Sequence, residues 1–368
     1  MFFKSLSDNT QKRLIRRLEE VNHDIRTRGI SRSDNSHSAI AGIQDLLTGY
    51  SYGEFYDWDL YYENLYLSHF GIARYCRTNF EAFLDRQLEC GFVARTMMEQ
   101  RMRQHFKPFL AQIAVLGSRQ FGRFEWLKDR YYQRLIKYLD YWCWFCDFDK
   151  NGLSVWDSAD HSGMDNQDLR AGHIYSMTIE GVDLNSYLVR EFDAMSVIAE
   201  GLGLEEDASQ WKEKAAAMRG RINDIMWDEK DGFYYDLWSG DRLSGSKTLA
   251  SYWALLAGIV PEDRIDRIFI NFCNPWPRSK HNKRRLTYPL KLEKYKQFLK
   301  KNGEIRFKTD DLPLFNDTLE YFSDTGYDVV YKTNDLHNSD VADNILTEHE
   351  KMFSEEGIKI NYCVAVYR

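Results

Sequence analysis

The loop SVWDSADHSGMDNQ, residues 154–167, gathers side chains suited to chemistry on a carbohydrate. Its candidates are Trp156, Asp157, Asp160, His161, Asp165 and Asn166. Cleavage of a glycosidic bond needs a carboxylic acid to protonate the leaving oxygen, together with aromatic and polar groups that hold the sugar. A loop on a rigid scaffold can aim such groups into a cleft. The same residue types also cap helices and anchor cores, so composition alone leaves both interpretations open.

A second loop, NPWPRSKHNKRRL at residues 274–286, has the residue types that bind phosphates. Two prolines restrict its turn, and five basic side chains and His281 follow Trp276. Cations at this density hold a phosphate backbone, and an indole ring can stack on a base. A solvated basic loop without a ligand is the alternative interpretation.

Charge is distributed unevenly along the 368 residues. Residues 264–368 carry 18 basic and 16 acidic side chains, whereas the remainder carries 31 basic and 40 acidic ones. Within 278–308 there are 12 basic and 2 acidic residues, although the whole chain has a net charge of −7. A local positive field of this strength favours an anionic partner such as nucleic acid. The acidic first part is not typical of a nucleic-acid binder.

The first loop lies among predicted helices. Apolar residues recur at helical spacing from Leu184 to Ile198 and again from Trp211 to Ile225. The intervening GLGLEED at 201–207 is suited to end the first helix. Further apolar runs, which also predict helices, cover 61–76, 80–115 and 125–146. Paired helices joined by long aromatic loops indicate an α/α toroid whose loops build a pocket at one end.

The later residues alternate between strand and helix patterns. Strands are predicted at 266–272, 303–309, 327–333 and 359–368, and helices at 289–301, 311–322 and 341–354. Such alternation predicts an α/β sheet. Five of the six prolines lie from Pro261 onward, whereas nine of the ten tryptophans precede position 264. We therefore place a domain boundary within 259–265.

Composition also limits the class of protein and its compartment. No stretch of 18 apolar residues is present, and the N-terminus lacks the apolar run of a signal peptide. We therefore expect a cytoplasmic protein. The six cysteines show no disulfide framework, and the CxxC of Cys143 and Cys146 is interpreted as two buried thiols. No metal site is expected.

Several segments before residue 260 resemble the α/α-toroid glycosidases, which include trehalases, processing α-glucosidases and mannosylglycerate-hydrolase-like enzymes. The matching segments, in chain order, are FYDWDLYY at 55–62, the SGMDNQ loop, VDLNSYL at 182–188 and WDEKDGFYYDL at 227–237. The resemblance implies a mainly α domain over 1–262, an incomplete (α/α)6 toroid, with carbohydrate as its partner. By motif position Asp165 would be the general acid. Trp58, Asp59 and Trp156 would line the sugar subsite, and Asn166 would hold a hydroxyl.

The resemblance also implies inversion of configuration, which needs a second carboxylate about 6.5–9.5 Å from the acid to activate water. In this family the base lies in the last helices of the toroid. The chain leaves the pattern near Ile259, so we expect the base to be absent and hydrolysis to be impaired.

From about Arg264 the chain resembles the C-terminal half of bacterial tRNA (guanine-N7)-methyltransferases. The matching segments are INFCNPWPRSKHNKRRLTYP, GEIRFKTDD, DLHNSD and NILTEHE. The resemblance implies a partial Rossmann-like sheet over 264–368, S-adenosylmethionine as cofactor and tRNA as partner. Asn274 would lie near the cofactor, where the family usually has Asp, and Arg278 would contact substrate, where it usually has Lys. The other implied substrate-binding residues are Asp310, Thr347, Glu348, His349 and Glu350.

The Gly-rich strand-to-helix turn that would hold the cofactor is not found upstream, because GLG at 201–203 lies between two predicted helices. A half sheet would also leave an unpaired edge strand. The sequence therefore predicts a chimeric chain whose two parts are each catalytically incomplete. The alternatives are a non-enzymatic carbohydrate- or tRNA-binding remnant and an artefactual gene fusion.

Overall fold

The computed structural model describes residues 55–97, 104–164, 179–238, 247–261 and 264–368, the backbone of 241–242, and eight helical positions between 12 and 23. The chain divides into two compact units, Met1–Ile259 and Val260–Arg368. Over these described residues, no helix combines the length and apolar character needed to cross a membrane.

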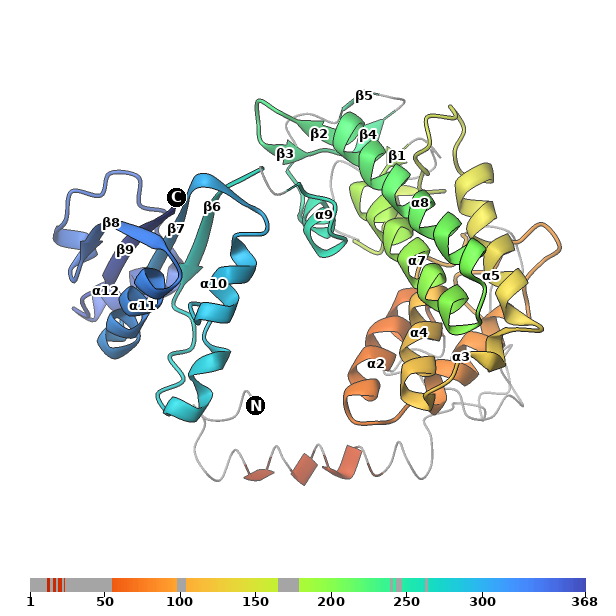
Figure 1. Ribbon diagram of the computed structural model, residues 1–368, viewed down its shortest axis with the longest axis horizontal. Coiled ribbons are helices and arrows are strands. Elements are labelled where there is room, and N and C mark those ends of the chain that lie inside the picture. Colours follow the sequence, from red (N-terminus) through yellow and green to blue (C-terminus); the bar gives the residue numbers. More distant parts are fainter. Residues whose placement is uncertain are drawn as a thin grey trace. The chain divides into compact units, whose positions relative to one another are not determined.

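The N-terminal unit is built from helices (Figure 1). Its α-helices are α2 (Asp57–His69), α3 (Arg74–Leu84), α4 (Leu110–Phe121), α5 (Tyr131–Asp140), α7 (Val182–Gly201), α8 (Glu205–Arg221) and α9 (Trp253–Leu256). Short 3-10 turns at Glu125–Leu127, Ala159–Ser162 and Leu249–Tyr252, and π turns at Tyr141–Phe145 and Ile222–Met226, extend or join them.

The helices α7 and α8 form the predicted antiparallel hairpin (Figure 1). Helix α7 is buried on nearly all sides, and its buried residues include polar side chains such as Asp183, Asn185 and Glu191 as well as apolar ones. Helix α8 buries a single stripe, Ala208, Trp211, Ala215 and Met218, at steps of three and four. The turn between the two helices uses Gly203 at φ 74°. The predictions from periodicity are confirmed here.

The prediction of a helix across 80–115 is wrong in its middle. Helix α3 ends at Leu84 and α4 begins only at Leu110, with irregular chain over the described residues between them. Gly91 has φ 96°, and an added Cβ there would lie 2.2 Å from the Lys137 carbonyl oxygen. The backbone here instead forms two isolated antiparallel β-bridges, which pair Tyr56 with Thr96 and Ala94 with His105. The apolar spacing in this segment therefore reflects burial rather than helix.

The N-terminal unit also contains two small antiparallel sheets. One contains β1 (Ile179–Glu180), β4 (Leu237–Trp238) and β5 (Asp241–Arg242), and the other pairs β2 (Trp227–Asp228) with β3 (Phe233–Tyr234). Strand β1 also meets Trp156 through Ile179. The two ends of the loop 157–178 are thereby held side by side.

The C-terminal unit is a four-stranded mixed sheet with helices (Figure 1). Its elements are β6 (Ile265–Asn271), α10 (Pro289–Tyr295), β7 (Leu299–Thr309), α11 (Leu312–Asp324), β8 (Tyr327–Thr333), α12 (Glu348–Glu355) and β9 (Asn361–Tyr367). The strand order is β6-β7-β9-β8, in which β6 and β7 are parallel and β9 runs antiparallel to both of its neighbours. The predicted partial α/β sheet is confirmed, although α10 ends six residues before the predicted limit of 301 because β7 already begins at Leu299.

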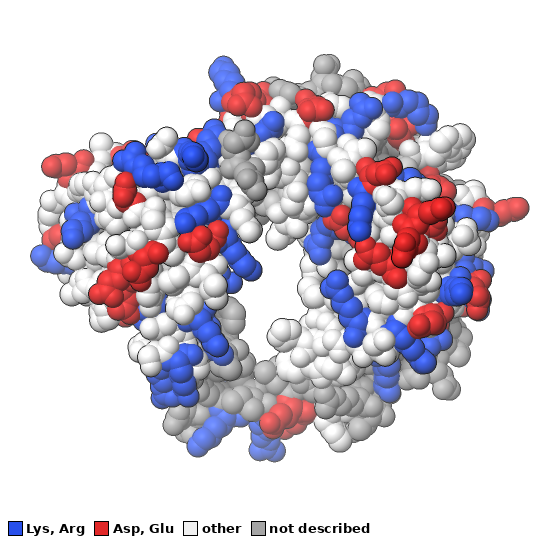
Figure 2. Space-filling view, viewed as in Figure 1, with Lys and Arg blue, Asp and Glu red and all other residues white. Residues whose placement is uncertain are grey.

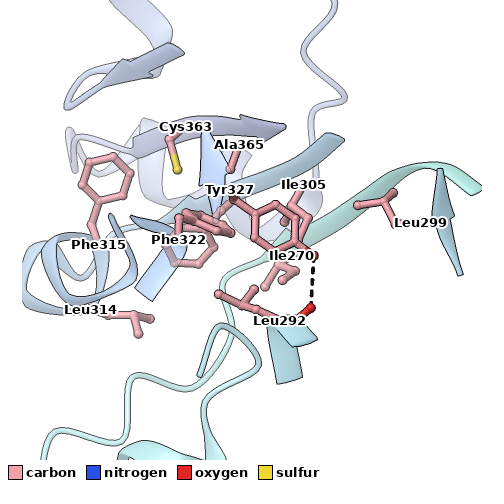
Figure 3. Close-up of a cluster of buried hydrophobic side chains, with 11 residues drawn as sticks. Ile270, Leu292, Leu299, Ile305, Leu314, Phe315, Phe322, Tyr327, Cys363 and Ala365 are labelled. Atoms are coloured by element: carbon pink, nitrogen blue, oxygen red, sulfur yellow. Dashed lines mark hydrogen bonds between the residues drawn. The ribbon is translucent and has the colours of Figure 1, made fainter. Parts of the chain in front are cut away.

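Apolar side chains from this sheet, α10 and α11 form a separate core (Figure 3). Its buried members are Ile270, Leu292, Leu299, Ile305, Phe307, Leu314, Phe315, Phe322, Tyr327, Cys363 and Ala365. The Tyr327 hydroxyl donates to the Leu292 carbonyl at 3.0 Å, which satisfies the one polar tip in the cluster. Strand β6 pairs only with β7 among the described strands, and Ile270 is its single fully buried residue.

Candidate functional site

The first predicted sugar-binding segment and the predicted acid loop meet at Trp58 and Gly163. Gly163 has φ 74°, and a Cβ added to it would lie 2.4 Å from Cζ2 of Trp58. Glycine is therefore required on two grounds, its backbone conformation and the close approach of the indole ring. Two segments that are far apart in the sequence thus form one surface, and Gly163 stands two residues before Asp165.

A buried ion pair anchors Trp58. Lys107 Nζ lies 3.0 Å from Asp57 Oδ1, and both side chains are fully buried. The backbone N–H groups of Trp58 and Lys107 donate to the same carboxylate, and Lys107 Nζ lies 5.0 Å from the Trp58 ring centroid. Burial acts to raise the pKa of Asp57, but the charges of Lys107 and Arg95 outweigh it and the pKa is lowered. An ionised Asp57 therefore fixes the start of α2.

Asp59 is partly buried in the first turn of α2. Burial raises the pKa of its carboxyl group, and the charge of the neighbouring Asp57 adds to this shift. A perturbed carboxyl beside a part-exposed indole is typical of a binding site, although structural charge networks produce the same shift. Its role in holding a sugar stays a prediction.

Trp156 is fully buried at the start of the acid loop. Its Nε1 donates to Asp183 Oδ1 at 3.1 Å, and its ring meets Trp142 edge to face at 5.9 Å. A Cβ at Gly181 would lie 2.4 Å from Trp156 Nε1, so the indole is enclosed on this side as well. In this arrangement Trp156 closes the base of the loop, and its stacking on a sugar stays a prediction.

Asp157 and His161 form a buried pair inside the same loop. His161 Nδ1 contacts Asp157 Oδ1, and Asp157 Oδ2 accepts from the His105 backbone N–H at 3.0 Å. The His161 ring stacks on Trp142 at 5.8 Å and is fully buried. These contacts tie the loop to the core of the unit.

Asp165 and Asn166, the predicted acid and hydroxyl-binding residues, lie outside the described residues. Their roles stay predictions. Two carboxyl groups that the sequence patterns do not single out, Glu180 and Glu191, have a pKa raised to about 7 by burial. Glu191 accepts from the backbone N–H groups of Ala111 and Gln112 at 2.9 and 3.0 Å, so it caps α4 from α7. The burial of Glu191 inside α7 is a structural feature that the sequence patterns did not indicate.

In the C-terminal unit, several predicted residues lie at the carboxyl edge of the parallel strands. Strand β6 ends at Asn271 and is followed by Asn274, and β7 ends at Thr309 and is followed by Asp310. Ligands of open α/β sheets bind at this edge. Both Asn274 and Asp310 are exposed, and Asn274 Oδ1 accepts from the Trp276 backbone N–H at 3.1 Å.

Glu350 lies at the centre of a buried polar network. Lys308 Nζ donates to its Oε2 at 2.8 Å, and Asn344 Nδ2 donates to its Oε1 at 2.7 Å. Burial acts to raise the pKa of Glu350, but these donors outweigh it and the pKa is lowered. Thr347 caps α12 by accepting from the Glu350 backbone N–H at 3.2 Å. Glu350 is thus engaged within the protein, and its contact with substrate stays a prediction.

The remaining predicted residues of the TEHE segment differ in their surroundings. Glu348 and His349 are exposed, and the His349 ring meets Phe353 at 4.4 Å and Phe272 at 5.1 Å. Both residues open α12. Neither is enclosed by the buried network around Glu350.

The basic loop separates into exposed cations and one structural arginine. Arg278, Lys280 and Lys283 are exposed, whereas Arg285 is buried and donates to Pro275 O, Asp317 and Tyr321. The Arg284 guanidinium lies 5.2 Å from the Trp276 ring centroid. Exposed acidic and basic side chains both occur on the visible face of each unit (Figure 2).

Comparison with known proteins gives two separate matches. Residues 250–363 match the profile of a putative methyltransferase family. A tRNA (guanine-N(7)-)-methyltransferase from Clostridium beijerinckii is 57% identical over 121 residues, 33% of this chain and 55% of that protein. One from Clostridium novyi is 52% identical over 125 residues, 34% of this chain and 58% of that protein. The chain thus spans about half the length of the curated relatives it matches.

The helical unit is similar in fold to a solved structure, neutral trehalase from Saccharomyces cerevisiae. The match has a TM-score of 0.51 and 19% identity, and it covers 59% of this chain and 52% of that chain. Both resemblances inferred from the sequence are confirmed. Residues 52–278, more than half of the chain, match the mannosylglycerate hydrolase MGH1-like glycoside hydrolase domain. By this match the chain belongs to the MGH1-like glycoside hydrolase family.

Proposed function

We propose that the N-terminal unit binds a carbohydrate on the surface where α2 meets the acid loop. The observation that supports this is the contact of the Trp58 ring with Gly163, which joins the two segments that resemble the sugar-binding and acid loops of the family. Trp58 and Asp59 would contact the sugar, together with Asn166, and Asp165 would be the acid. Burial or a nearby carboxylate would have to raise the pKa of Asp165 for it to remain protonated near neutral pH.

Catalysis by this unit is expected to be incomplete, because the base of an inverting glycosidase is expected in a region that this chain replaces after Ile259. A glycan array with the full chain tests binding, and release of sugar from α-glucosides and mannosylglycerate tests cleavage. Loss of binding in Asp59→Ala supports the site. Cleavage that persists in Asp165→Asn would exclude Asp165 as the acid.

We further propose that the C-terminal unit binds tRNA through the basic loop and the carboxyl edge of β6 and β7. The exposed Arg278 and Lys280 beside Trp276 support this, together with Asp310 at the same edge. Substrate orientation for transfer to guanine N7 would rest on Asp310 and the residues Thr347–Glu350.

The residues present do not fit S-adenosylmethionine, although the relatives are methyltransferases. Strand β6 is the edge of the described sheet, and the half that would carry the Gly-rich cofactor turn is not found beside it. Asn274 holds the Trp276 backbone with its side-chain oxygen. We therefore assign no methyl-transfer step to this chain. Methyl transfer by the purified chain to tRNA, measured with labelled cofactor, would overturn this assignment.

The joining of the two units is itself a proposal, with units at 1–262 and 264–368. The two family matches overlap over 250–278, so neither profile places an inserted linker between them. A remnant that binds both ligands without catalysis and an artefactual fusion remain the alternatives. Digestion of the source proteins with Lys-C distinguishes them, because one peptide, Thr248–Lys280, must span the join. Detection of that peptide establishes the fusion, and its absence beside flanking peptides from both units refutes it.

A further inference from the structure

A loop of the N-terminal unit has the residue pattern of a calcium-binding turn. Residues 147–152 read DFDKNG, with Asp147, Asp149 and Asn151 at alternate positions before Gly152. Calcium loops take ligands from their first, third and fifth residues and need glycine at the sixth for a sharp turn. Gly152 has φ 87° and Lys150 has φ 60°, so the backbone makes this turn.

Within the loop, side-chain oxygens accept hydrogen bonds from nearby backbone N–H groups. The Gly152 N–H donates to Asp147 Oδ2 at 3.2 Å, and the Asn151 N–H donates to Asp149 Oδ1 at 3.2 Å. The Leu153 N–H donates to Asn151 Oδ1 at 2.8 Å. The side-chain oxygens at the first, third and fifth positions therefore each accept from a backbone N–H of the same turn.

A third carboxylate reaches the turn from strand β1. Asn151 Nδ2 donates to Asp149 Oδ2 at 3.0 Å and to Glu180 Oε1 at 2.9 Å. A partly positive amide nitrogen thus lies between two carboxylates, in the position that a cation would take. Among the ion pairs of the described residues, none joins Asp147, Asp149 or Glu180 to a lysine or arginine.

Two oxygens of this group are buried without a hydrogen-bond partner. They are Asp147 Oδ1 and Glu180 Oε2, on side chains of residues that are 7% and 3% exposed. A buried carboxylate oxygen without a donor is unfavourable unless a proton or a metal ion supplies the missing partner.

The nearest cations do not fill that role. Lys150 Nζ donates to the Trp144 carbonyl at 2.8 Å and lies 5.4 Å from the Trp144 ring centroid. The Arg221 side chain lies near Gly152, where its Nε would be 3.3 Å from an added Cβ, and it forms no ion pair with Asp147 or Glu180 among the described residues. The orphaned oxygens are therefore left to an external ligand.

We propose that Asp147, Asp149, Asn151 and Glu180 bind Ca²⁺, with the Leu153 main-chain carbonyl as the ligand at the seventh position. As the described side chains stand, no three His, Cys, Asp or Glu converge closely enough to hold a metal. A calcium loop does not need this, because amide and main-chain oxygens complete its shell. On binding, the ion replaces the Asn151 nitrogen between the carboxylates, and Asn151 turns its oxygen inward.

The site has a structural consequence. Glu180 follows Ile179, which pairs with Trp156 across the base of the loop 157–178. The ion therefore joins both ends of the predicted acid loop to residues 147–153. This proposal is independent of whether the unit binds or cleaves a sugar.

Calorimetric titration of CaCl₂ into the EDTA-treated full chain tests the proposal. We expect one Ca²⁺ per chain with a dissociation constant on the order of 10⁻⁵–10⁻³ M, a higher melting temperature with Ca²⁺, and a smaller response to Mg²⁺, which demands a stricter octahedral shell. Terbium added in place of calcium should emit under tryptophan excitation, because Trp144 lies three residues before the loop and its ring centroid is 5.4 Å from Lys150 Nζ.

Matched variants separate binding from folding. Asp147→Asn and Glu180→Gln should each weaken Ca²⁺ binding by roughly tenfold or more, whereas Glu200→Gln, whose carboxylate pairs with Lys212 on the surface, should leave it unchanged. In EDTA, Glu180→Gln should melt no lower than the parent, because it removes a buried carboxylate oxygen that lacks a hydrogen-bond donor. Absence of binding to the parent up to about 10 mM Ca²⁺ overturns the proposal, and so does parental affinity in both variants.

Discussion

Lys107 Nζ lies 3.0 Å from Asp57 Oδ1 in an ion pair that is closed to solvent. Removing one partner of such a pair leaves an uncompensated buried charge. We expect Lys107→Met to lower the free energy of unfolding of the N-terminal unit by about 3–5 kcal/mol, measured by urea denaturation. Lys212→Met, at a surface ion pair, should change it by less than about 1 kcal/mol. Equal effects of the two substitutions would contradict the assigned role of Lys107.

The contact between Trp58 and Gly163 has a matched control. Gly163→Ala introduces both a residue with positive φ and a clash with the indole, whereas Gly203→Ala has the same φ of 74° but open space. Alanine in this conformation costs about 1–2 kcal/mol, so we expect that loss from Gly203→Ala and a larger one from Gly163→Ala. Thermal unfolding of both variants measures the difference.

The same pair offers a second comparison. If the indole is the clashing group, Trp58→Ala should reduce the additional cost of Gly163→Ala in a double-mutant cycle. An unchanged cost would show that Trp58 does not restrict the loop.

Glu191 predicts a pH dependence of stability. Burial raises the pKa of its carboxyl group in the folded protein to about 7, above the ordinary value of 4.5. Because the folded state holds this proton more tightly than the unfolded chain, the contribution is fully present below about pH 4.5 and is lost as pH rises through about 7. Relative to Glu191→Gln, the parent should therefore lose a few kcal/mol between about pH 5 and pH 7.5, since a tenfold change in an equilibrium constant corresponds to about 1.4 kcal/mol. Urea denaturation of both proteins across this range measures the loss, and a constant difference contradicts the raised pKa.

The basic loop predicts a division between binding and folding. Arg278→Ala and Lys280→Ala should weaken tRNA binding, and each should reduce the slope of log K against log salt by about 0.7–0.9. Arg285→Ala should instead lower stability, because Arg285 is buried and bonded to Asp317, Tyr321 and Pro275 O. Filter binding at several salt concentrations gives the slopes. If neither Arg278→Ala nor Lys280→Ala changes the slope, the basic loop does not contact the RNA.

The periodicity of apolar residues predicted correctly the helices with one buried face and the segment in which strands alternate with helices. The α7–α8 hairpin and the alternation of strands and helices after Arg264 follow from apolar spacing, which burial enforces directly. The described residues of the segment 85–109 were predicted incorrectly, because Phe92, Val93, Phe106 and Phe109 are buried without helix and Gly91 passes close to Lys137. The spacing of apolar residues along the sequence carries no information about the close approach of Gly91 to Lys137.

The candidate sites were predicted unevenly for a similar reason. Trp58 and the acid loop are recognisable by residue type, but the buried partner Lys107 is not, since a lysine is normally expected at the surface. The DFDKNG turn is visible in the sequence, but its residue types alone do not separate it from the aromatic loop around it. What marks it in the structure is Glu180, which arrives from a strand 29 residues after Asn151.

Among the described strands β6 is paired on one side only, and an open strand edge would make the behaviour of this chain depend on its concentration. Pairing of two exposed strand edges is a second-order process, so its rate rises with the square of protein concentration, while folding of the unit is first-order. Dilution therefore favours the folded single chain, and concentration favours edge-to-edge association. A dilute sample of this protein would then contain mainly single chains, and a concentrated sample would contain associated chains.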